Sequence, residues 1–335
     1  MKKSLIALAV LAASGASFAQ SNATVYGLAD IWFGSVKTDD GVGNSVTNTK
    51  LDSGGVNTSR WGLKGSEDLG GGLKANFLLE QGFFLDNGAS KVAGQTFSRY
   101  AYVGFSGGFG EIKLGKTGTA YDDVSGASDA VFDSALAPMN NVFVSVNYSW
   151  TPPNSIYYAT PTFGGFNAAI SYSLGEDKTP TTGASSITSL NAAYAAGPLG
   201  VHFGYQVEDV ATSSNDTKYM RLGATYDFGV ATAKATYGKV NNVGNLDGRD
   251  ATDFQIGVDF PVSSVLTLSG SYAKSDDNNN AGVYEQSRKG WGFAAAYTLS
   301  KRTFLYGGYN TNSFSQQNAS DAKLDILAVG VQHRF

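Results

Sequence analysis

The 335-residue sequence contains no cysteine and only two histidines. Without cysteine the chain has no disulfide framework, no thiolate metal site and no thiol chemistry. His202 and His333 stand far apart and show no H-x-x-x-H spacing, so neither a histidine metal site nor a serine triad is indicated. "GFSGG" at 104–108 matches the hydrolase motif G-x-S-x-G, but it closes a hairpin where that motif needs a strand-to-helix turn. We therefore expect no cofactor, no metal and no enzymatic activity.

The sequence also lacks a basic excess and, beyond its first residues, any long hydrophobic run. Its formal net charge of −4 argues against nucleic acid as a partner. No later stretch approaches the roughly eighteen apolar residues of a spanning helix. A membrane location would therefore require a β-barrel, which 42 glycines, 13% aromatic residues and only 7 prolines favour.

The first 19 residues show the three regions of a secretory signal peptide. Lys2 and Lys3 precede an apolar run over 5–13, and residues 17–19 read Ser-Phe-Ala. The run is too short for the alternative, a membrane anchor. We predict a signal peptide over 1–19 and one domain over 20–335, outside the cytoplasm. Loss of Lys2 and Lys3 leaves 22 bases against 28 acids.

Strict alternation of apolar and polar residues predicts the strands. In "FNAAISYSLG" (166–175) one phase is Phe, Ala, Ile, Tyr and Leu, and the other is Asn, Ala, Ser and Ser. The pattern recurs at 199–208, 220–228, 253–260 and 290–299, each time with one apolar face. Tyrosine and phenylalanine near the strand ends favour a lipid-facing band with aromatic girdles around a polar interior. A soluble β-sandwich is the alternative.

The connections between these strands alternate between tight turns and long polar loops. Bacterial barrels have even strand numbers, short periplasmic turns and long external loops. Seven tight turns and eight long loops predict an all-β fold, a transmembrane 16-stranded antiparallel β-barrel. The tight turns are at 67–72, 106–110, 160–165, 195–200, 227–230, 261–264 and 299–302, and the long loops at 38–54, 86–93, 118–150, 176–186, 209–217, 241–251, 275–288 and 312–321.

The chain ends on "LAVGVQHRF", inside a predicted strand. In a closed barrel the last strand pairs with the first, here about 23–37, so that no edge is left exposed. The phase of Val329, Val331 and His333 then faces lipid, and Phe335 joins the periplasmic aromatic girdle.

Several blocks of the sequence resemble the general porins of Gram-negative outer membranes, in particular the trimeric β-proteobacterial and neisserial type. The resemblance covers essentially the whole chain after residue 19. The blocks are "NATVYGLADIWFG", "TSRWGLKGSEDLGGGLKANFLLE", "FSRYAYVGFSGGFGEIKLGK", "NSIYYATPTFGGFNAAISY", "LSKRTFLYGGYN" and "VGVQHRF". The resemblance implies an outer-membrane homotrimer of barrels, in contact with lipid and lipopolysaccharide, that passes small hydrophilic solutes and ions. In that family the barrel-assembly machinery reads the terminal phenylalanine, here Phe335.

The resemblance also implies a pore constriction. The family folds its third external loop inward, and the matching segment is about 118–150. Opposite this loop the family places basic residues on the barrel wall. The residues that match the acidic side of the constriction are Asp122, Asp123, Asp129 and Asp133 on the loop and Glu80 as a lumen acid. The residues that match or flank the basic wall are Arg60, Lys64, Arg99, Lys113 and Lys116.

One departure from the family pattern bears on ion selectivity. The family's third wall base falls shortly before the "NSI" block, but no base occurs between Thr117 and Asp177, where six acids do. With Arg60 and Arg99 as the two matching wall bases, we expect a weak cation preference rather than strong anion selectivity. Acids and bases on opposite walls would create a transverse field across the passage.

Two functions are therefore carried forward. The first is a general diffusion pore. The alternative is a substrate-specific channel with a binding site, which an aromatic row on the polar phase would favour, but the alternation of the sequence shows no such row. Two acidic stretches, 37–44 and 275–282, have the oxygen ligands that calcium prefers, although such runs are more often plain external loops.

Overall fold

The computed structural model describes residues 22–278, 285–315 and 320–335. The predicted signal peptide at 1–19 lies outside these residues. One antiparallel sheet contains every strand in the described ranges. Its strands are β1 (Asn22–Asp39), β2 (Ser45–Ser53), β3 (Arg60–Gly70), β4 (Leu73–Gly82), β5 (Tyr100–Gly107), β6 (Gly110–Lys116), β7 (Ser155–Ala159), β8 (Phe166–Leu174), β9 (Ser186–Ala196), β10 (Leu199–Asp209), β11 (Thr217–Asp227), β12 (Thr232–Asn241), β13 (Asp250–Pro261), β14 (Leu266–Asn278), β15 (Glu285–Ser300), β16 (Thr303–Phe314) and β17 (Ala322–Arg334).

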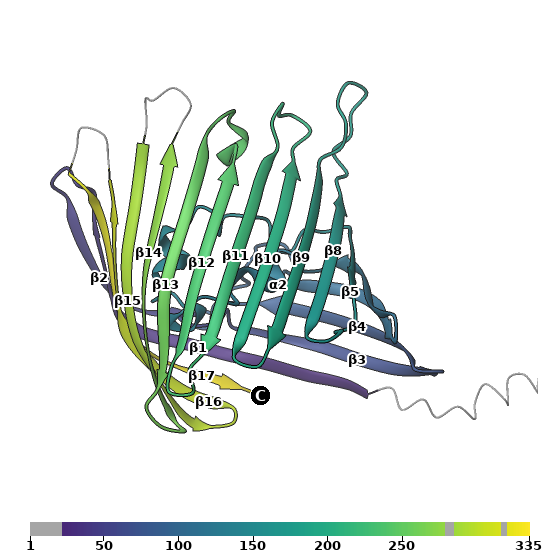
Figure 1. The fold of residues 1–335 in the computed structure, drawn as a ribbon, viewed down its shortest axis with the longest axis horizontal. Helices are drawn as coiled ribbons and strands as arrows, with labels where there is room; N and C mark the ends of the chain where they lie inside the picture. The colour runs from purple at the N-terminus through teal and green to yellow at the C-terminus, as the bar shows by residue number, and fades with distance from the viewer. Residues whose placement is uncertain (1–21, 279–284, 316–319) are drawn as a thin grey trace, which may run out of the picture.

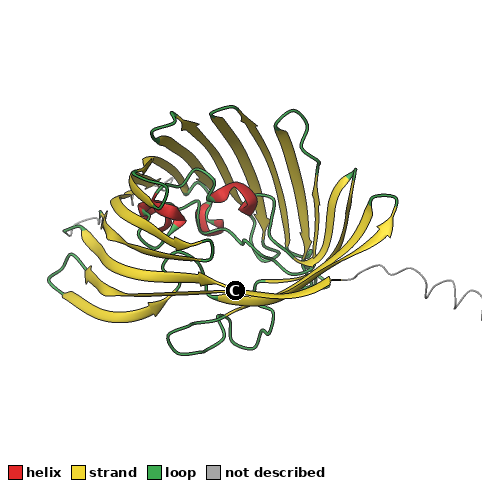
Figure 2. Ribbon diagram, turned by 90° about the horizontal axis from the view of Figure 1, so that it is seen from below, coloured by secondary structure: helices red, strands yellow, loops and turns green. Residues whose placement is uncertain are grey.

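The sheet closes on itself (Figures 1 and 2). β17 pairs with β1 over a register that runs from Leu28 opposite Arg334 to Asp39 opposite Lys323. The other edge of β1 is shared, because β2 pairs with residues 31–39 and β3 with residues 22–28. β2 and β3 therefore act as one strand interrupted at 54–59, and the predicted 16-stranded antiparallel barrel is confirmed.

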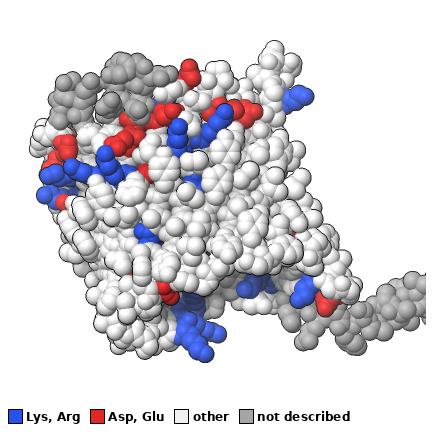
Figure 3. All heavy atoms as spheres, in the orientation of Figure 1, with Lys and Arg blue, Asp and Glu red and all other residues white. Residues whose placement is uncertain are grey.

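The barrel has the inverse polarity of a soluble protein. On β8, Phe166, Ile170 and Leu174 are about half exposed on the outer face, whereas Ser171 and Ser173 are buried on the inner face. Gln206, Gln255 and Gln332 are likewise buried, each on an inward phase. On the surface shown in Figure 3, charged residues gather toward the two ends of the barrel, and the broad middle is mostly uncharged. An apolar outer band around a polar interior is the pattern of a barrel in lipid.

The strand boundaries confirm the seven predicted tight turns, which all lie at one end of the barrel (Figure 1). The predicted loop at 38–54 is wrong, because β1 continues to Asp39 and β2 occupies 45–53. This hairpin alternates poorly, since "SVTNTKLDS" is polar on both phases, and so periodicity could not reveal it. The second loop is also longer than predicted, from 83 to 99.

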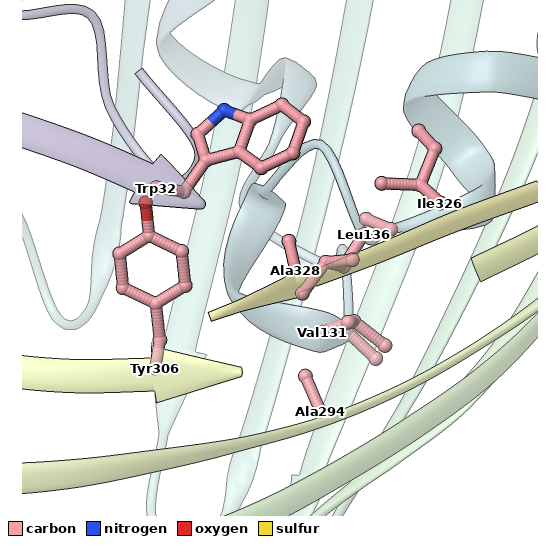
Figure 4. Close-up of a cluster of buried hydrophobic side chains, with 9 residues drawn as sticks. Trp32, Val131, Leu136, Ala294, Tyr306, Ile326 and Ala328 are labelled. Carbon is pink, nitrogen blue, oxygen red and sulfur yellow. The ribbon is translucent and has the colours of Figure 1, made fainter. Parts of the chain in front are cut away.

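Residues 117–154 join β6 to β7 and contain α2 (Asp122–Ser125), the short 3-10 helix η1 (Val131–Asp133) and α3 (Pro138–Val142). In Figure 2 these helices lie within the outline of the barrel. Val131 and Leu136 of this segment pack with Trp32, Tyr306 and inward residues of β15 and β17 in one apolar cluster (Figure 4). Among the described residues no helix is long and apolar enough to cross a membrane.

The last residue completes the pairing of the first and last strands. The Phe335 amide donates to the Gly27 carbonyl and the Gly27 amide donates to the Phe335 carbonyl, both at 3.0 Å. A side chain at position 27 would clash with the Phe335 ring, because an added Cβ would lie 2.2 Å from its Cζ. Glycine at 27 therefore makes room for a terminal aromatic that is half exposed on the outer face.

Candidate functional site

Two inner surfaces of the barrel differ in character, and segment 117–154 contacts both. We call the first the charged wall: the inward residues of β1 and β3–β7, among them Arg60, Glu80 and Lys113, together with Arg99 just before β5. We call the second the docking wall: the inward residues of β8–β14 that hydrogen-bond segment 117–154, which are mostly small or neutral but include Asp253, Arg221 and Lys234.

Glu80 lies at the centre of the charged wall. Its carboxylate is nearly fully buried, and it pairs with Arg99 at 2.7 Å and with Arg60 at 3.4 Å. The Tyr26 hydroxyl also donates to it, at 2.6 Å. We expected Glu80 on the acidic side of the constriction, but the structure places it among the bases, because β4 pairs with both β3 and β5 and brings the three side chains together. One carboxylate therefore serves both matching wall arginines.

The remaining predicted bases extend this wall. The Lys64 ammonium lies 4.9 Å from the ring centre of Tyr26. Lys113 pairs with Glu111 at 3.1 Å and lies 4.5 Å from the ring centre of Tyr157. The Lys116 ammonium donates to the Thr151 carbonyl at 2.6 Å, so it holds the end of segment 117–154 rather than standing free.

Strict alternation counted from Arg99 predicts Val103 on the polar face and Tyr100 and Tyr102 toward lipid, and this prediction is wrong. In β5, however, Val103 is half exposed on the outer face, and Tyr102 meets Lys113 on the inner face. Arg99 precedes the first residue of β5, so its side chain does not follow the strand's alternation and still turns inward.

This correction reveals aromatic rings on the polar face that the sequence reading missed. Tyr100 and Trp150 meet edge to face with ring centres 6.0 Å apart, and the Arg99 guanidinium lies 4.8 Å from the Trp150 ring. Together with Tyr26, Tyr102 and Tyr157 they line the charged wall. We refer to these five residues as the aromatic row. Its cations lie within the range of cation–π contact.

The four predicted loop acids have different surroundings. Asp122 accepts from the Tyr148 hydroxyl at 2.6 Å, and burial raises its pKa to about 6, an effect that this hydrogen bond and nearby Arg99 oppose. Asp123 accepts from Tyr157 at 2.7 Å; burial raises its pKa too, against this hydrogen bond and the charge of Lys113. These two acids therefore lie within reach of the charged wall.

Asp129 and Asp133 make no hydrogen bond or ion pair with that wall among the described residues. Asp129 is almost completely buried, neither carboxylate oxygen has a hydrogen-bond partner, and burial raises its pKa well above the usual value. The nearest bases are Lys234, which donates to the Asp129 carbonyl at 2.8 Å, and Arg221. Asp133 accepts from the side-chain amide of Asn140 at 2.9 Å. Among the described residues no ion pair joins a loop acid to Arg60 or Arg99.

The docking wall binds segment 117–154 through side chains of its inner face. Ser189 accepts from the Tyr121 amide and Ser269 from the Val131 amide, both at 2.7 Å. Buried Asp253 accepts from the amides of Ser145 at 2.8 Å and Val144 at 3.2 Å. Arg221, which is buried, donates to the Ser125 carbonyl and the Ser145 hydroxyl. The sequence placed Arg221 on a polar phase but gave no reason to assign it a role.

No group of three or more histidine or carboxylate side chains suited to a metal ion occurs in the part of the chain that the structure describes. In the stretch 37–44, the Asp40 carboxylate accepts hydrogen bonds from Val42 and Asn44. Part of the second candidate calcium stretch, 275–282, lies outside the described residues.

A closed antiparallel barrel with an apolar outside, a polar inside and charged groups along its passage defines a channel of the outer membrane. Residues 5–317 match the Gram-negative porin family, and the chain belongs to that family. It is an outer-membrane porin channel, as its sequence resemblance indicated.

Individual relatives agree with this assignment. The chain is 36% identical to outer membrane porin protein 32 of Delftia acidovorans, over 99% of this chain and 94% of that protein. It is 26% identical to the major outer membrane protein P.IB of Neisseria meningitidis serogroup A, over the full length of both. Among solved structures, an anion-selective porin from Comamonas acidovorans superposes with a TM-score of 0.78 at 29% identity, over 94% of this chain and 100% of that one. The trimer form of OmpT from Vibrio cholerae, at 17% identity, shares the fold with a TM-score of 0.70, over 94% of this chain and 99% of that one.

Proposed function

We propose that this protein is a general diffusion pore for small hydrophilic solutes and ions, with a weak preference for cations. Segment 117–154 forms its constriction, folded inward from the third external loop. The observation that carries the proposal is the ion pairing of both wall arginines with buried Glu80. A carboxylate shared by two bases lowers the net positive charge that the wall presents to a permeating ion.

The proposed ion selectivity is opposite in sign to that of the similar porin from Comamonas acidovorans, which is anion-selective. Two features of this chain support the proposed cation preference. Glu80 offsets half of the charge of Arg60 and Arg99, and no base stands between Thr117 and Asp177. Asp122 and Asp123 meanwhile lie within reach of the same wall. The local charge balance is therefore near neutral or negative.

Planar-bilayer recording of the purified protein across a potassium chloride gradient tests this proposal. We expect a small reversal potential of cation-selective sign at low salt. It should fade toward 1 M salt, where the screening length falls to about 3 Å. Strong chloride preference would refute the proposed charge balance, and absence of any conductance would refute the pore itself.

A substrate-specific channel is the second candidate, and the aromatic row favours it. Tyrosine and tryptophan rings beside cations offer a stacking surface that a purely electrostatic pore does not need. Single-channel current in the presence of sugars or small aromatic acids distinguishes the two. A general pore should pass these solutes without saturation, whereas a binding site should produce concentration-dependent block that Trp150→Ala relieves.

We further propose that the functional unit is a homotrimer in contact with outer-membrane lipid and lipopolysaccharide, and that the barrel-assembly machinery reads Phe335. The pairing of Phe335 with Gly27 supports the role given to Phe335, because this residue completes the pairing of β17 with β1. Deleting Phe335 should sharply reduce the amount of protein in outer-membrane fractions, and Lys323→Ala, a change on the same strand, should not. Unboiled samples should migrate as trimers on gels. Normal assembly of the truncated chain would contradict the role given to Phe335.

A further inference from the structure

The interruption between β2 and β3 is an unusual feature of this barrel. Ser53 pairs with Ile31 and Arg60 pairs with Leu28, so the six residues 54–59 stand opposite only two residues of β1. We call residues 54–59 the excursion. Backbone groups displaced from a sheet in this way need other hydrogen-bond partners.

Asp30 supplies most of these partners. Its buried carboxylate accepts hydrogen bonds from the amides of Gly55 and Asn57, both at 2.9 Å, and of Val56 at 3.2 Å. The Tyr306 hydroxyl donates to the same carboxylate at 2.6 Å. Hydrogen bonds to an ionised acceptor are the stronger kind, so the excursion is held chiefly by one side chain.

The excursion in turn contacts both sides of the pore. The Ala135 amide of segment 117–154 donates to the Gly55 carbonyl at 2.8 Å. On the other side, Arg60 follows the excursion directly, and its guanidinium donates to the Thr58 carbonyl at 3.3 Å. No side chain would fit at Gly55, because a Cβ there would lie 2.2 Å from the Tyr306 hydroxyl. Asp30 is thus linked through the excursion to segment 117–154 on one side and to Arg60 on the other.

Segment 117–154 needs such support next to Ala135. Val131, Phe132 and Asp133 adopt positive φ angles of 61°, 65° and 50° in succession. Side chains with a Cβ disfavour this region, so three consecutive cases persist only where the surroundings hold them. The bond from Ala135 to Gly55 is one such contact.

We propose that Asp30 is a positioning residue of the pore, which holds the excursion so that Gly55 fixes segment 117–154 while Arg60 stays on the charged wall. The proposal rests on the proposed function in one respect, namely that segment 117–154 forms the constriction. Asp30 itself is buried and does not meet the permeating ion.

Single-channel recording of Asp30→Asn tests the proposal, with Asp52→Asn as the matched control. Asp52 also carries one negative charge beside the excursion, but its carboxylate contacts only Lys50 and Ser53 among the described residues. We expect the frequency of closures and sub-conductance states at fixed voltage to rise about ten-fold in Asp30→Asn, which corresponds to about 1.4 kcal/mol. Asp52→Asn should resemble the wild type. Equal behaviour of the two variants would overturn the proposal.

Amide hydrogen exchange of the wild-type and variant barrels gives a second readout that does not depend on conductance. In Asp30→Asn, exchange should accelerate both in the excursion and in residues 130–137. Faster exchange confined to the excursion would overturn the link to segment 117–154.

A second variant, Tyr306→Phe, serves if Asp30→Asn fails to assemble. It removes only one of the four hydrogen bonds to the carboxylate and should produce the same changes at smaller size. A Tyr306→Phe barrel identical to the wild type in both readouts would then refute the proposal. A wild-type barrel that does not conduct would refute the proposed function, while the exchange experiment would still test Asp30.

Discussion

The charged wall and the docking wall belong to the same sheet but use polar side chains in opposite ways. On the charged wall, Arg60, Arg99 and Lys113 stay partly exposed and are paired with acids or rings. On the docking wall, Ser189, Ser269 and Asp253 are buried because segment 117–154 covers them. The difference shows that a polar inner face can serve as a lining for ions or as a binding surface for the protein's own chain. Which role it takes depends on what lies against it.

Among changes to the docking wall, a substitution at Asp253 should weaken the binding of segment 117–154 most. In Asp253→Leu the amides of Val144 and Ser145 lose a buried ionised acceptor, and each such bond contributes on the order of 1.5–3 kcal/mol. Exchange of these two amides should accelerate about 100-fold or more. Asp250→Leu is the control, because Asp250 lies on the same strand and its carboxylate contacts only Asn241 and Asn242 among the described residues. Unchanged protection in Asp253→Leu would show that the segment is held elsewhere.

The charged wall should respond in ion selectivity rather than in docking. Replacing Asp122 and Asp123 by Asn removes two acids within reach of Arg99 and Lys113, so the reversal potential should move toward anions. Arg60→Ala should move it toward cations. Asp177→Asn, in an external loop, should have little effect. Reversal potentials that stay fixed in all of these variants would place the charges outside the ion path.

The pH dependence of ion selectivity tests the part that Asp122 plays opposite the charged wall. Because the pKa of Asp122 is about 6, this acid is mostly ionised at pH 7 and mostly protonated at pH 5. Cation preference should therefore weaken as the pH falls through 6. A carboxyl with a raised folded-state pKa is destabilising when ionised, so the same pH drop should also favour the folded segment. Asp122→Asn should lack this part of the pH response; a full response in that variant would assign it to another group.

The smallest expected effect is on the docking wall, at Ser189. Ser189→Ala removes one neutral hydrogen bond to the Tyr121 amide, worth about 1 kcal/mol. Exchange of that amide should accelerate about five-fold, with conductance unchanged. An effect as large as that of Asp253→Leu would contradict the distinction between neutral and ionised acceptors.

Local sequence patterns predicted much of this molecule. Alternation predicted strands such as β8 and β10 because lipid on one side and water on the other impose a period of two. By the same alternation, Arg60 and apolar Trp61 fall on opposite faces of their strand, and in the structure Trp61 is exposed on the outer face. These features depend only on a few neighbouring residues, so a local sequence pattern is enough to predict them.

The features that the sequence could not predict depend on contacts between distant residues. The partners of Glu80 follow from the register of β4 with β3 and β5, which no local pattern reports. The inward turn of Arg99 depends on its place one residue before β5. The partners of Asp30 lie in the excursion, which could not be located from the sequence. Polar residues on both phases of 45–59 give no sign of where β2 ends.

The most direct test of the account is the reversal potential of Glu80→Gln beside that of the wild type, recorded across the same potassium chloride gradient at about 0.1 M salt, where the screening length is about 10 Å. If Glu80 offsets the charge of both arginines, its loss leaves Arg60 and Arg99 uncompensated, and the weak cation preference of the wild type should reverse to an anion preference. Glu176→Gln, which removes an acid from an external loop, should leave the potential nearly unchanged. A Glu80→Gln pore with the same reversal potential as the wild type would contradict the central claim that this buried carboxylate sets the charge of the passage.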